Sequence, residues 1–421
     1  MAKTAQIIQK ILSKINPSPK ERKAVGAIVE EAMKICRKTA KNSEIVLCGS
    51  FAKDTYLSGI RDVDIFLVAR EGRTAETDCL ADAEACAKAL SPKGYERKFS
   101  SHKYFTADFK GYKFDLVPAY PFKPGEALRS SVDRTPLHAE YINGNLSDKA
   151  VARLMKAFCR GVGVYGADAK NQGFSGYLCE LIAAKEGTFE QILKSSAGMK
   201  HPLEIPDPVD SERNVASAVS EDSLERFKRS AKAFLSKPSE LFFFQGKVPA
   251  KVPALNSKKQ ISLIYKETFE AEDALYSKAR SNLAQIVKDV SDIGFSVKRS
   301  GFAASPASGE VLFILEFDKM FLPRTRIVEG PPLSVRRDYI DAFVSKHGKE
   351  KVYQKKGRLY AKEDRKIFEA RQAVLAMGRT FLPTFALVES QKALSAIFRE
   401  LPDGEKRRLC SFLLKREVWQ V

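Results

Sequence analysis

The chain has 421 residues, of which 44% are hydrophobic and 29% are charged, and its formal net charge at pH 7 is +19. This length predicts two to four domains rather than one core, and the lack of any run of about 18 uncharged apolar residues argues against a membrane-spanning helix. The positive charge favours a polyanionic partner such as nucleic acid, but it locates no site because Lys and Arg are spread along the whole chain.

The first third of the sequence alternates between helix-like and strand-like patterns. Residues 1–16 read as an amphipathic helix that lacks the apolar core and cleavage site of a secretion signal, so we expect a cytoplasmic protein. Further helices are predicted over 25–39 and 78–90. The predicted strands cover 44–48, 62–69, 104–109 and 113–119, the last two joined by a tight turn at Lys110-Gly111.

The middle of the chain, 138–238, reads as helical, with helices at 149–161 and 175–184 and an extended loop at 202–208. A connector is expected at 245–256. The last third alternates again, which suggests an α+β module with mixed strands. Its predicted strands are 260–267, 295–302, 311–317, 352–354 and 358–361, and its helices include 275–293 and 335–347.

Seven cysteines occur singly, at positions 36, 48, 79, 86, 159, 179 and 410, and no C-x-x-C pair is present. Four histidines cannot complete a zinc-finger pattern. We therefore expect buried free thiols in a reducing compartment rather than disulfides or a metal site.

The residues that suggest chemistry begin at a Gly-Ser turn, Gly49-Ser50, which follows the strand at 44–48. Glycine permits a close approach of the backbone to a ligand, and exposed amides at a helix start favour phosphate. A D-x-D strand follows, in which alternation places Asp62 and Asp64 on one face. A third acid, Asp115, lies in the apolar strand KFDLV, where an unpaired carboxylate is costly.

Adjacent carboxylates repel one another unless a cation lies between them, and Mg²⁺ favours a few carboxylates together with substrate phosphates. Each feature alone has an ordinary explanation: Gly-Ser is a common turn, and D-x-D is often a solvated strand face. The combination in this order is typical of the polymerase-beta nucleotidyltransferase superfamily.

The sequence resembles the archaeal-type (class I) CCA-adding enzymes, which are tRNA nucleotidyltransferases. The resemblance runs in family order from residue 47 to about 217 and is weaker afterwards. The blocks that carry it are GSFAKDTYLSG, DVDIFLV, KGYKFDLVPAY, SSVDRTPLH, LMKAFCRGVGVYGAD, GFSGYLCEL and DPVDSERNVA.

The resemblance implies an α+β multidomain protein: a nucleotidyltransferase (polymerase-beta-like) head with a mixed sheet over 1–137, a helical central domain over 138–256, and an α+β tRNA-binding body and tail over 257–421. It implies that Asp62, Asp64 and Asp115 bind two Mg²⁺ ions, and that His102 helps to hold this metal site. The residues that it assigns to the nucleotide are Gly49, Ser50, Lys53, Arg134, Thr135, His138, Lys156, Tyr165 and Arg213.

Two positions depart from the family pattern. The family often has Arg where Lys53 stands, so a planar fork is lost while the charge is kept. It often has Glu where Asp62 stands, so the first carboxylate here is one methylene shorter. Several of the assigned side chains also have a structural explanation: His138 could cap a helix, Lys156 and Tyr165 could be ordinary surface and core positions, and Arg213 could pair with Asp210 or Glu212.

The implied reaction is attack of the tRNA 3′-hydroxyl on the α-phosphate of CTP or ATP, with release of pyrophosphate. The implied RNA contacts are the acceptor stem and the TΨC arm, and homodimer formation is left open. Candidate RNA-binding residues in the last third are Lys298, Arg299, Arg324, Arg326, Arg336, Arg337, Lys355, Lys356 and Arg358, most of them expected to be solvated surface charges.

Three other functions remain open on the sequence alone. A poly(A) polymerase or an oligoadenylate-type synthetase would share the core motif. A small-molecule nucleotidyltransferase would not need this length or charge. A non-catalytic RNA-binding protein has no physical reason to keep three clustered acids.

Overall fold

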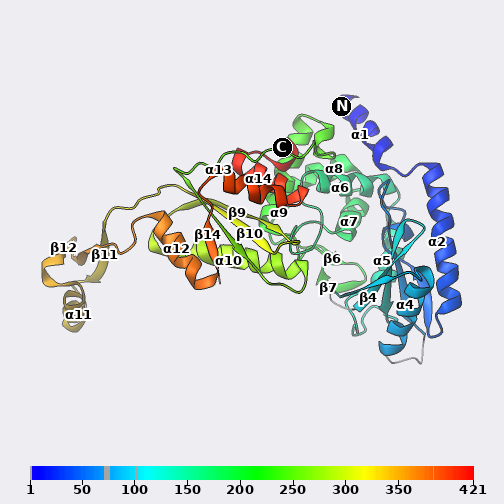
Figure 1. The fold of residues 1–421 in the computed structure, drawn as a ribbon, viewed down its shortest axis with the longest axis horizontal. Helices are drawn as coiled ribbons and strands as arrows, with labels where there is room; N and C mark the ends of the chain where they lie inside the picture. The colour runs from blue at the N-terminus through cyan, green and yellow to red at the C-terminus, as the bar shows by residue number, and fades with distance from the viewer. Residues whose placement is uncertain (1, 71–75, 100–102, 383) are drawn as a thin grey trace. The chain divides into compact units, whose positions relative to one another are not determined.

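The computed structural model describes the chain except residues 1, 71–75, 100–102 and 383, and it contains two compact units (Figure 1). The N-terminal unit comprises residues 1–246 and 418–420, and the C-terminal unit comprises residues 247–417 and 421. The division into three domains inferred from the sequence stays a prediction. In the described ranges, no helix combines the length and apolar character that crossing a membrane requires.

The N-terminal unit begins with two helices and a mixed five-stranded sheet in the order β1-β2-β5-β4-β3. Strands β2 and β5 are parallel, and the other neighbours are antiparallel. The elements are α1 Ala2–Ile15, α2 Pro19–Thr39, β1 Ser43–Leu47, α3 Gly49–Ala52, β2 Asp62–Ala69, α4 Glu76–Leu90, β3 Tyr95–Phe99, β4 Lys103–Phe109 and β5 Tyr112–Ala119.

Alternation along the strands decides which face of this sheet is covered. Val63, Ile65 and Leu67 of β2 are fully buried in one apolar cluster that also includes side chains of α2 and α4. Those two helices contact each other and the sheet (Figure 1). Because successive side chains of a strand point to opposite faces, Asp62 and Asp64 lie on the face that α2 and α4 leave open.

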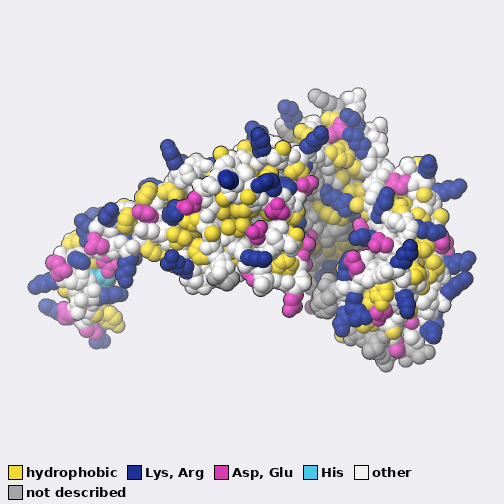
Figure 2. Space-filling model, in the orientation of Figure 1, with side chains coloured by type: hydrophobic (Ala, Val, Ile, Leu, Met, Phe, Trp, Pro, Cys, Tyr) yellow, Lys and Arg dark blue, Asp and Glu magenta, His cyan; other side chains and the backbone are white. Residues whose placement is uncertain are grey.

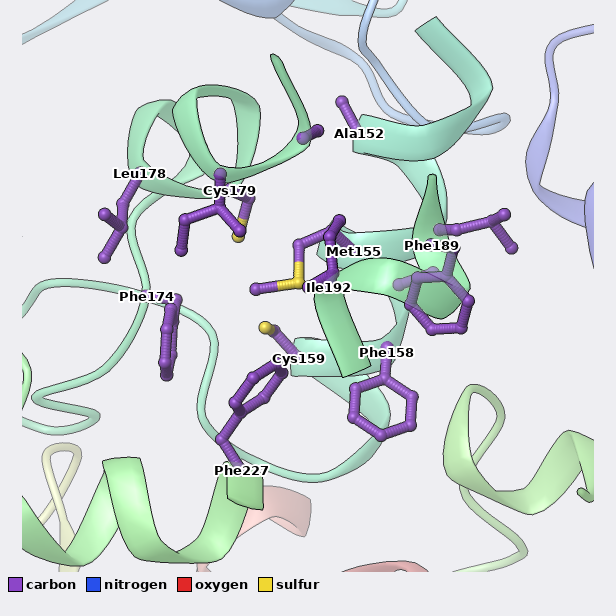
Figure 3. Packing of buried hydrophobic residues seen from close by; sticks show 14 of the residues in the cluster. Ala152, Met155, Phe158, Cys159, Phe174, Leu178, Cys179, Phe189, Ile192 and Phe227 are labelled. Atoms are coloured by element: carbon purple, nitrogen blue, oxygen red, sulfur yellow. The ribbon is translucent and has the colours of Figure 1, made fainter. Parts of the chain in front are cut away.

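The rest of the N-terminal unit is helical and has its own core. Helix α6 is buried along almost its whole length, and Met155, Phe158 and Cys159 pack against residues of α7, α8 and α9 (Figure 3). Helix α7 begins where Ser175 accepts a hydrogen bond from the Leu178 amide, as a helix-capping serine does. The elements are α5 Thr135–Asn145, α6 Lys149–Gly161, α7 Gly176–Glu186, α8 Phe189–Ser195, η1 Ser196–Gly198, β6 Pro206–Asp207, β7 Asp210–Asn214, α9 Glu221–Ser236 and η2 Glu240–Phe242.

The C-terminal unit contains an antiparallel four-stranded sheet in the order β14-β8-β10-β9, with helices packed on it. Strand β10 is buried from Val311 to Phe317 because it lies between β8 and β9. The elements are β8 Gln260–Lys266, α10 Glu272–Ile293, β9 Val297–Ser305, β10 Glu310–Phe317, α12 Ala370–Phe381, β14 Phe385–Leu387, α13 Gln391–Glu400 and α14 Asp403–Leu414; η4 Val418–Gln420 follows them in the chain and belongs mostly to the N-terminal unit.

A small module, here called the three-stranded module, lies within the C-terminal unit over residues 325–364. It consists of an antiparallel sheet in the order β11-β13-β12 and one helix. Leu359 and Ala361 are its buried hydrophobic side chains among the described residues. The elements are β11 Thr325–Pro332, α11 Arg337–His347, η3 Lys349–Lys351, β12 Val352–Lys355 and β13 Arg358–Asp364.

Most elements predicted from the sequence are confirmed to within a few residues, including the hairpin turn, where Lys110 and Gly111 have φ of 49° and 78° as a tight β-turn of this kind requires. All seven cysteines are buried free thiols, as predicted. The prediction of an extended loop at 202–208 is wrong in part, because its last residues form strand β6, which pairs with β7 in a two-stranded hairpin. Strands β3, β11 and β14 were also missed.

Candidate active site

Three carboxylates meet on the open face of the five-stranded sheet. Strands β2 and β5 are parallel neighbours, and their register places Asp64 directly beside Asp115. Asp62 lies two residues earlier on β2 and therefore on the same face. The sheet thus brings together acids that are 51 to 53 positions apart in the sequence.

These carboxylates interact electrostatically. Burial, followed by the negative charge of Asp115, raises the pKa of Asp64 to about 6. Burial also raises the pKa of Asp115, against the hydrogen bond of 2.6 Å that Thr106 Oγ1 donates to Asp115 Oδ1. Two neighbouring carboxyl groups that resist ionisation would be stabilised in their charged form by a cation bound beside them.

The arrangement suits a cation that also binds substrate phosphates. In the described part of the chain, no group of three or more His, Cys, Asp or Glu side chains is already arranged as a metal-binding cage. Mg²⁺ commonly binds to one or two protein carboxylates together with substrate phosphates and water. The proposed ligand His102 lies outside the described residues.

Gly49 brings the backbone against these acids. Its φ is +65°, and a Cβ at this position would lie 1.8 Å from Asp64 Oδ2, so a side chain fits neither the conformation nor the space. The preceding amide, that of Cys48, donates to the Asp64 carbonyl oxygen over 2.9 Å and fixes the turn to β2. Helix α3, which carries Ser50, is only a single turn. The feature that remains of the phosphate site expected at a helix start is the close approach of the Gly49 turn to Asp64.

A second group of charges is organised by Glu180 on α7, whose side chain is 1% exposed. Its Oε2 lies 2.5 Å from Lys53 Nζ, and its Oε1 lies 2.6 Å from Lys156 Nζ. Thr55 Oγ1 also donates to Oε1. Lys53 and Lys156 are therefore buried residues that share one carboxylate.

A third group is organised by Asp207 on β6, whose side chain is fully buried. Its Oδ2 accepts hydrogen bonds of 2.8 Å from both His138 Nε2 and Arg213 Nη1, and its Oδ1 accepts one of 3.2 Å from Tyr177. Although burial would raise the pKa of Asp207, the bonds from His138 and Arg213 lower it to about 2. The His138 ring also stacks on Tyr177, with centroids 3.9 Å apart.

The electrostatics of this third group show which partner carries charge. Burial lowers the pKa of His138 even though Asp207 acts in the opposite direction. Burial thus favours the neutral imidazole of His138, which donates to Asp207 from Nε2, while the other donor to the same oxygen is the guanidinium of Arg213.

The remaining predicted residues lie near these groups. Arg134 is buried and pairs with Asp210 on β7, and Thr135 begins α5. Arg160 lies over the Tyr165 ring, 4.7 Å from its centroid, and Tyr165 forms a β-bridge with Phe174. The structure thus gives the side chains of Arg134 and Tyr165 pairing or packing partners.

Two organising residues, Glu180 and Asp207, were not predicted as site residues. Glu180 could have been suspected from GYLCEL, where an acid stands among apolar residues of a helix. The ordinary pairing considered for Arg213, with Asp210 or Glu212, is wrong, because its partner is Asp207 and Asp210 pairs with Arg134. Arg213 itself lies on strand β7.

Comparison with known proteins places this geometry in a family. Residues 29–138 match the nucleotidyltransferase domain, residues 150–244 match the second domain of tRNA nucleotidyltransferases, and residues 257–381 match the C-terminal domain of CCA-adding enzymes. The CCA-adding enzyme of Sulfolobus acidocaldarius is 30% identical over 98% of both chains. The chain belongs to the CCA-adding enzyme family.

Other CCA-adding enzymes give the same result. That of Methanoregula boonei is 34% identical over 77% of this chain and 76% of its own, and that of Pyrobaculum neutrophilum is 30% identical over 84% and 88%. The family resemblance seen in the sequence, of archaeal type, is confirmed, and the chain is a nucleotidyltransferase with a polymerase-beta-like head. A solved structure of the Cid1 poly(U) polymerase covers 56% of this chain and 94% of its own at 15% identity, with a TM-score of 0.43.

Proposed function

We propose that this chain adds C, C and A to the 3′ end of tRNA, using CTP and ATP and releasing pyrophosphate. The observation that carries the proposal is the row of carboxylates at Asp62, Asp64 and Asp115 beside the Gly49 turn, in a chain of the CCA-adding enzyme family. In this reaction the RNA 3′-oxygen forms a bond to the α-phosphorus while the bond to the pyrophosphate oxygen breaks.

Asp62, Asp64 and Asp115 are the residues that would hold two Mg²⁺ ions. The ions, when bound, lower the cost of ionising the attacking hydroxyl and stabilise the leaving pyrophosphate. The raised pKa of Asp64 supports this role, because a carboxylate that resists ionisation alone gains most from a neighbouring cation. The shorter Asp62, at a place where the family often has Glu, is the exposed member of the three.

The nucleotide would contact residues from the Glu180 and Asp207 groups. Lys53 and Lys156, with Ser50, would bind the triphosphate, since their ammonium groups together exceed the charge of Glu180 by one. Arg213 would read the base edge, because its guanidinium has several donors and only Nη1 is paired with Asp207, while 36% of the side chain is exposed. Thr135, His138 and Tyr165 would complete the pocket.

The RNA would be gripped by basic residues of the C-terminal unit, since double-stranded RNA offers phosphates and a shallow minor groove. We propose the acceptor stem and the TΨC arm as the bound parts, in the cytoplasm. Some candidates are unsuited: Arg299 stacks on Phe412 and donates to its carbonyl oxygen, so it has a structural role. Arg336, Arg337, Lys355 and Lys356 are exposed and remain candidates. Whether two chains associate is not part of the proposal.

The test is to incubate the protein with tRNA that lacks CCA, together with CTP, ATP and Mg²⁺, and to sequence the product. We expect addition that stops after CCA. An oligo(A) tail would show a poly(A) polymerase, and tRNA binding without any extension would show a non-catalytic RNA-binding protein.

A further inference from the structure

Glu180 lies outside the set of groups that the proposed chemistry uses, yet it is among the most buried charged residues of the N-terminal unit. It lies on α7 and pairs with Lys156 on α6 and with Lys53, which follows α3. The three residues are separated by at least 24 positions in the sequence. Their meeting is therefore a product of the tertiary fold.

The number of donors exceeds what a structural ion pair between two helices needs. One lysine would satisfy that purpose, but Glu180 forms ion pairs with both Lys53 and Lys156 and also accepts a hydrogen bond from Thr55. Lys156 also donates to Thr55, at 2.9 Å to Oγ1 and 3.2 Å to the carbonyl oxygen. Both ammonium groups are thus fixed in position, with side chains only 8% and 4% exposed.

The carboxylate of Glu180 also acts on the titration of its partner Lys156. Burial lowers the pKa of Lys156, Glu180 opposes this effect, and the charge of Lys53 adds to it. Although burial would raise the pKa of Glu180, Lys156 and Lys53 lower it, so the acid is ionised at pH 7. Removing one partner of a buried charge cluster leaves the other charges uncompensated.

The cluster still carries a surplus of one positive charge, and its other charged or titratable neighbours do not cancel it. Lys149 on α6 adds to the surplus, whereas Asp64 on β2 opposes it. The other titratable groups that face the cluster are Cys179 and Tyr177 on α7 and Tyr165, together with His138 and Cys48, which interact with Lys53. A buried surplus of positive charge beside the carboxylates is suited to an anion with several oxygens.

We propose that Glu180 is a positioning residue for the triphosphate: it holds the ammonium groups of Lys53 and Lys156 in place, so that the phosphate-binding groups are arranged before the nucleotide arrives. This inference rests on the proposed function, because it takes the two lysines as triphosphate ligands. Glu180 itself contacts no phosphate in this scheme. Its effect comes from preorganisation, which reduces the ordering that binding would otherwise require.

The decisive experiment compares wild type with Glu180→Gln, which keeps the shape and removes the charge. Binding of ATP, CTP and inorganic tripolyphosphate is measured by equilibrium dialysis without RNA, at pH 7 and pH 9. We expect all three affinities to fall by roughly tenfold or more, which corresponds to about 1.4 kcal/mol, and to fall equally for the two nucleotides. KM rises accordingly, and kcat changes less.

The pH dependence separates positioning from a merely structural role. Without Glu180 the pKa of Lys156 falls further, so the variant loses its ammonium charge, and hence triphosphate affinity, at a lower pH than wild type does. Affinity of the variant should therefore decline more steeply from pH 7 to pH 9. A lower melting temperature with unchanged affinities and an unchanged pH profile would overturn the proposal.

Two further variants keep the test decisive if Glu180→Gln folds poorly. Glu180→Asp keeps the charge but withdraws the carboxylate by one methylene, and it should weaken tripolyphosphate binding with a pH profile like that of wild type; undiminished binding would contradict the proposal.

Glu405→Gln is a matched control, since Glu405 is equally buried and pairs with Arg408 in the C-terminal unit; it should lower stability and leave tripolyphosphate binding unchanged. Wild type that binds no ATP would instead contradict the proposed function.

Discussion

Charges are used differently in the nucleotide site and in the three-stranded module. In the site, Glu180 and Asp207 are buried, and each is bound by three side chains through hydrogen bonds or ion pairs. In the module, none of the described side chains of α11 is buried, and the Arg336 side chain is 81% exposed. Lys and Arg side chains project from the surface of this module, at the left of Figure 2.

The burial of these charges determines how strongly a single substitution affects stability or activity. A buried charge that loses its partner carries an uncompensated cost of several kcal/mol, whereas an exposed pair contributes about 0–1 kcal/mol. Single changes in the site should therefore have large, specific effects, and changes in the module should act collectively and depend on salt. The following predictions test this contrast in order of decreasing effect.

Asp64→Asn should have the largest effect. It removes a proposed metal ligand, and loss of about 4 kcal/mol of transition-state stabilisation corresponds to roughly 1,000-fold in rate. Nucleotide incorporation into tRNA should nearly vanish, while tRNA binding measured by filter retention should survive. Near-normal incorporation would remove the support for the metal assignment.

The same variant should be more stable than wild type in the absence of metal. The folded pKa of Asp64 is raised to about 6 from an ordinary value of 3.8, so the folded state bears an unfavourable charge above pH 6. That cost is at most about 3 kcal/mol, is fully present above pH 6, and disappears as the pH falls below about 4. Urea unfolding in EDTA at pH 8 and pH 4 measures it, and a less stable Asp64→Asn at pH 8 would refute the electrostatic account.

Asp207→Asn should have the next largest effect. It should lower stability, whereas Asp64→Asn raises it. The folded pKa of Asp207 is lowered to about 2, so its carboxylate contributes about 2 kcal/mol of stability above pH 4, and this contribution is lost as the pH falls toward 2. The stability difference between wild type and variant should shrink over that range. A constant difference between pH 5 and pH 2 would show that His138 and Arg213 do not stabilise the ionised form.

The two kinds of site residue differ in how far the sequence reveals them. The acid row could be predicted because period-two alternation is local, and it places Asp62 and Asp64 on one face without knowledge of the fold. The partners of Glu180 and Asp207 could not be predicted, because they are distant in sequence: Lys53 is 127 positions from Glu180, and His138 is 69 positions from Asp207. An isolated acidic residue in the sequence does not indicate which basic side chain it pairs with in the fold.

The strands that were missed also have a physical explanation. Strands β3, β11 and β14 each lie at the edge of a sheet. Edge strands are half-solvated and tolerate charged residues, glycine and proline, so YERKF and TRIVEGPP lack the apolar alternation that marks an inner strand. By contrast, an edge strand with an apolar run, such as β1 (SEIVL), was predicted, as were the inner strands β2 and β10.

Arg213→Ala tests the exposed side of the buried Asp207 group. Because one guanidinium nitrogen is held by Asp207 and the rest of the fork is partly free, the fork is oriented toward a ligand rather than consumed by the pair. We expect misincorporation of UTP and GTP to rise by about tenfold, within the roughly 1–3 kcal/mol that a bidentate base contact provides. Unchanged misincorporation with a lower melting temperature would mean that Arg213 only stabilises the fold through its pair with Asp207.

The smallest effect per residue is expected in the three-stranded module, from Arg336→Ala combined with Arg337→Ala. Arg336 pairs with Asp338 at the exposed start of α11, so its loss should hardly change the melting temperature. If these side chains neutralise RNA phosphates, the slope of log affinity for tRNA against log salt should become shallower by about one to two, since each contact releases a counterion. A matched double change at Arg226 and Lys228, which form ion pairs within α9 of the N-terminal unit, should leave the slope unaltered. Equal flattening by both double variants would mean that the slope reports the net charge of the chain, and the contrast between the site and the module would then not extend to RNA binding.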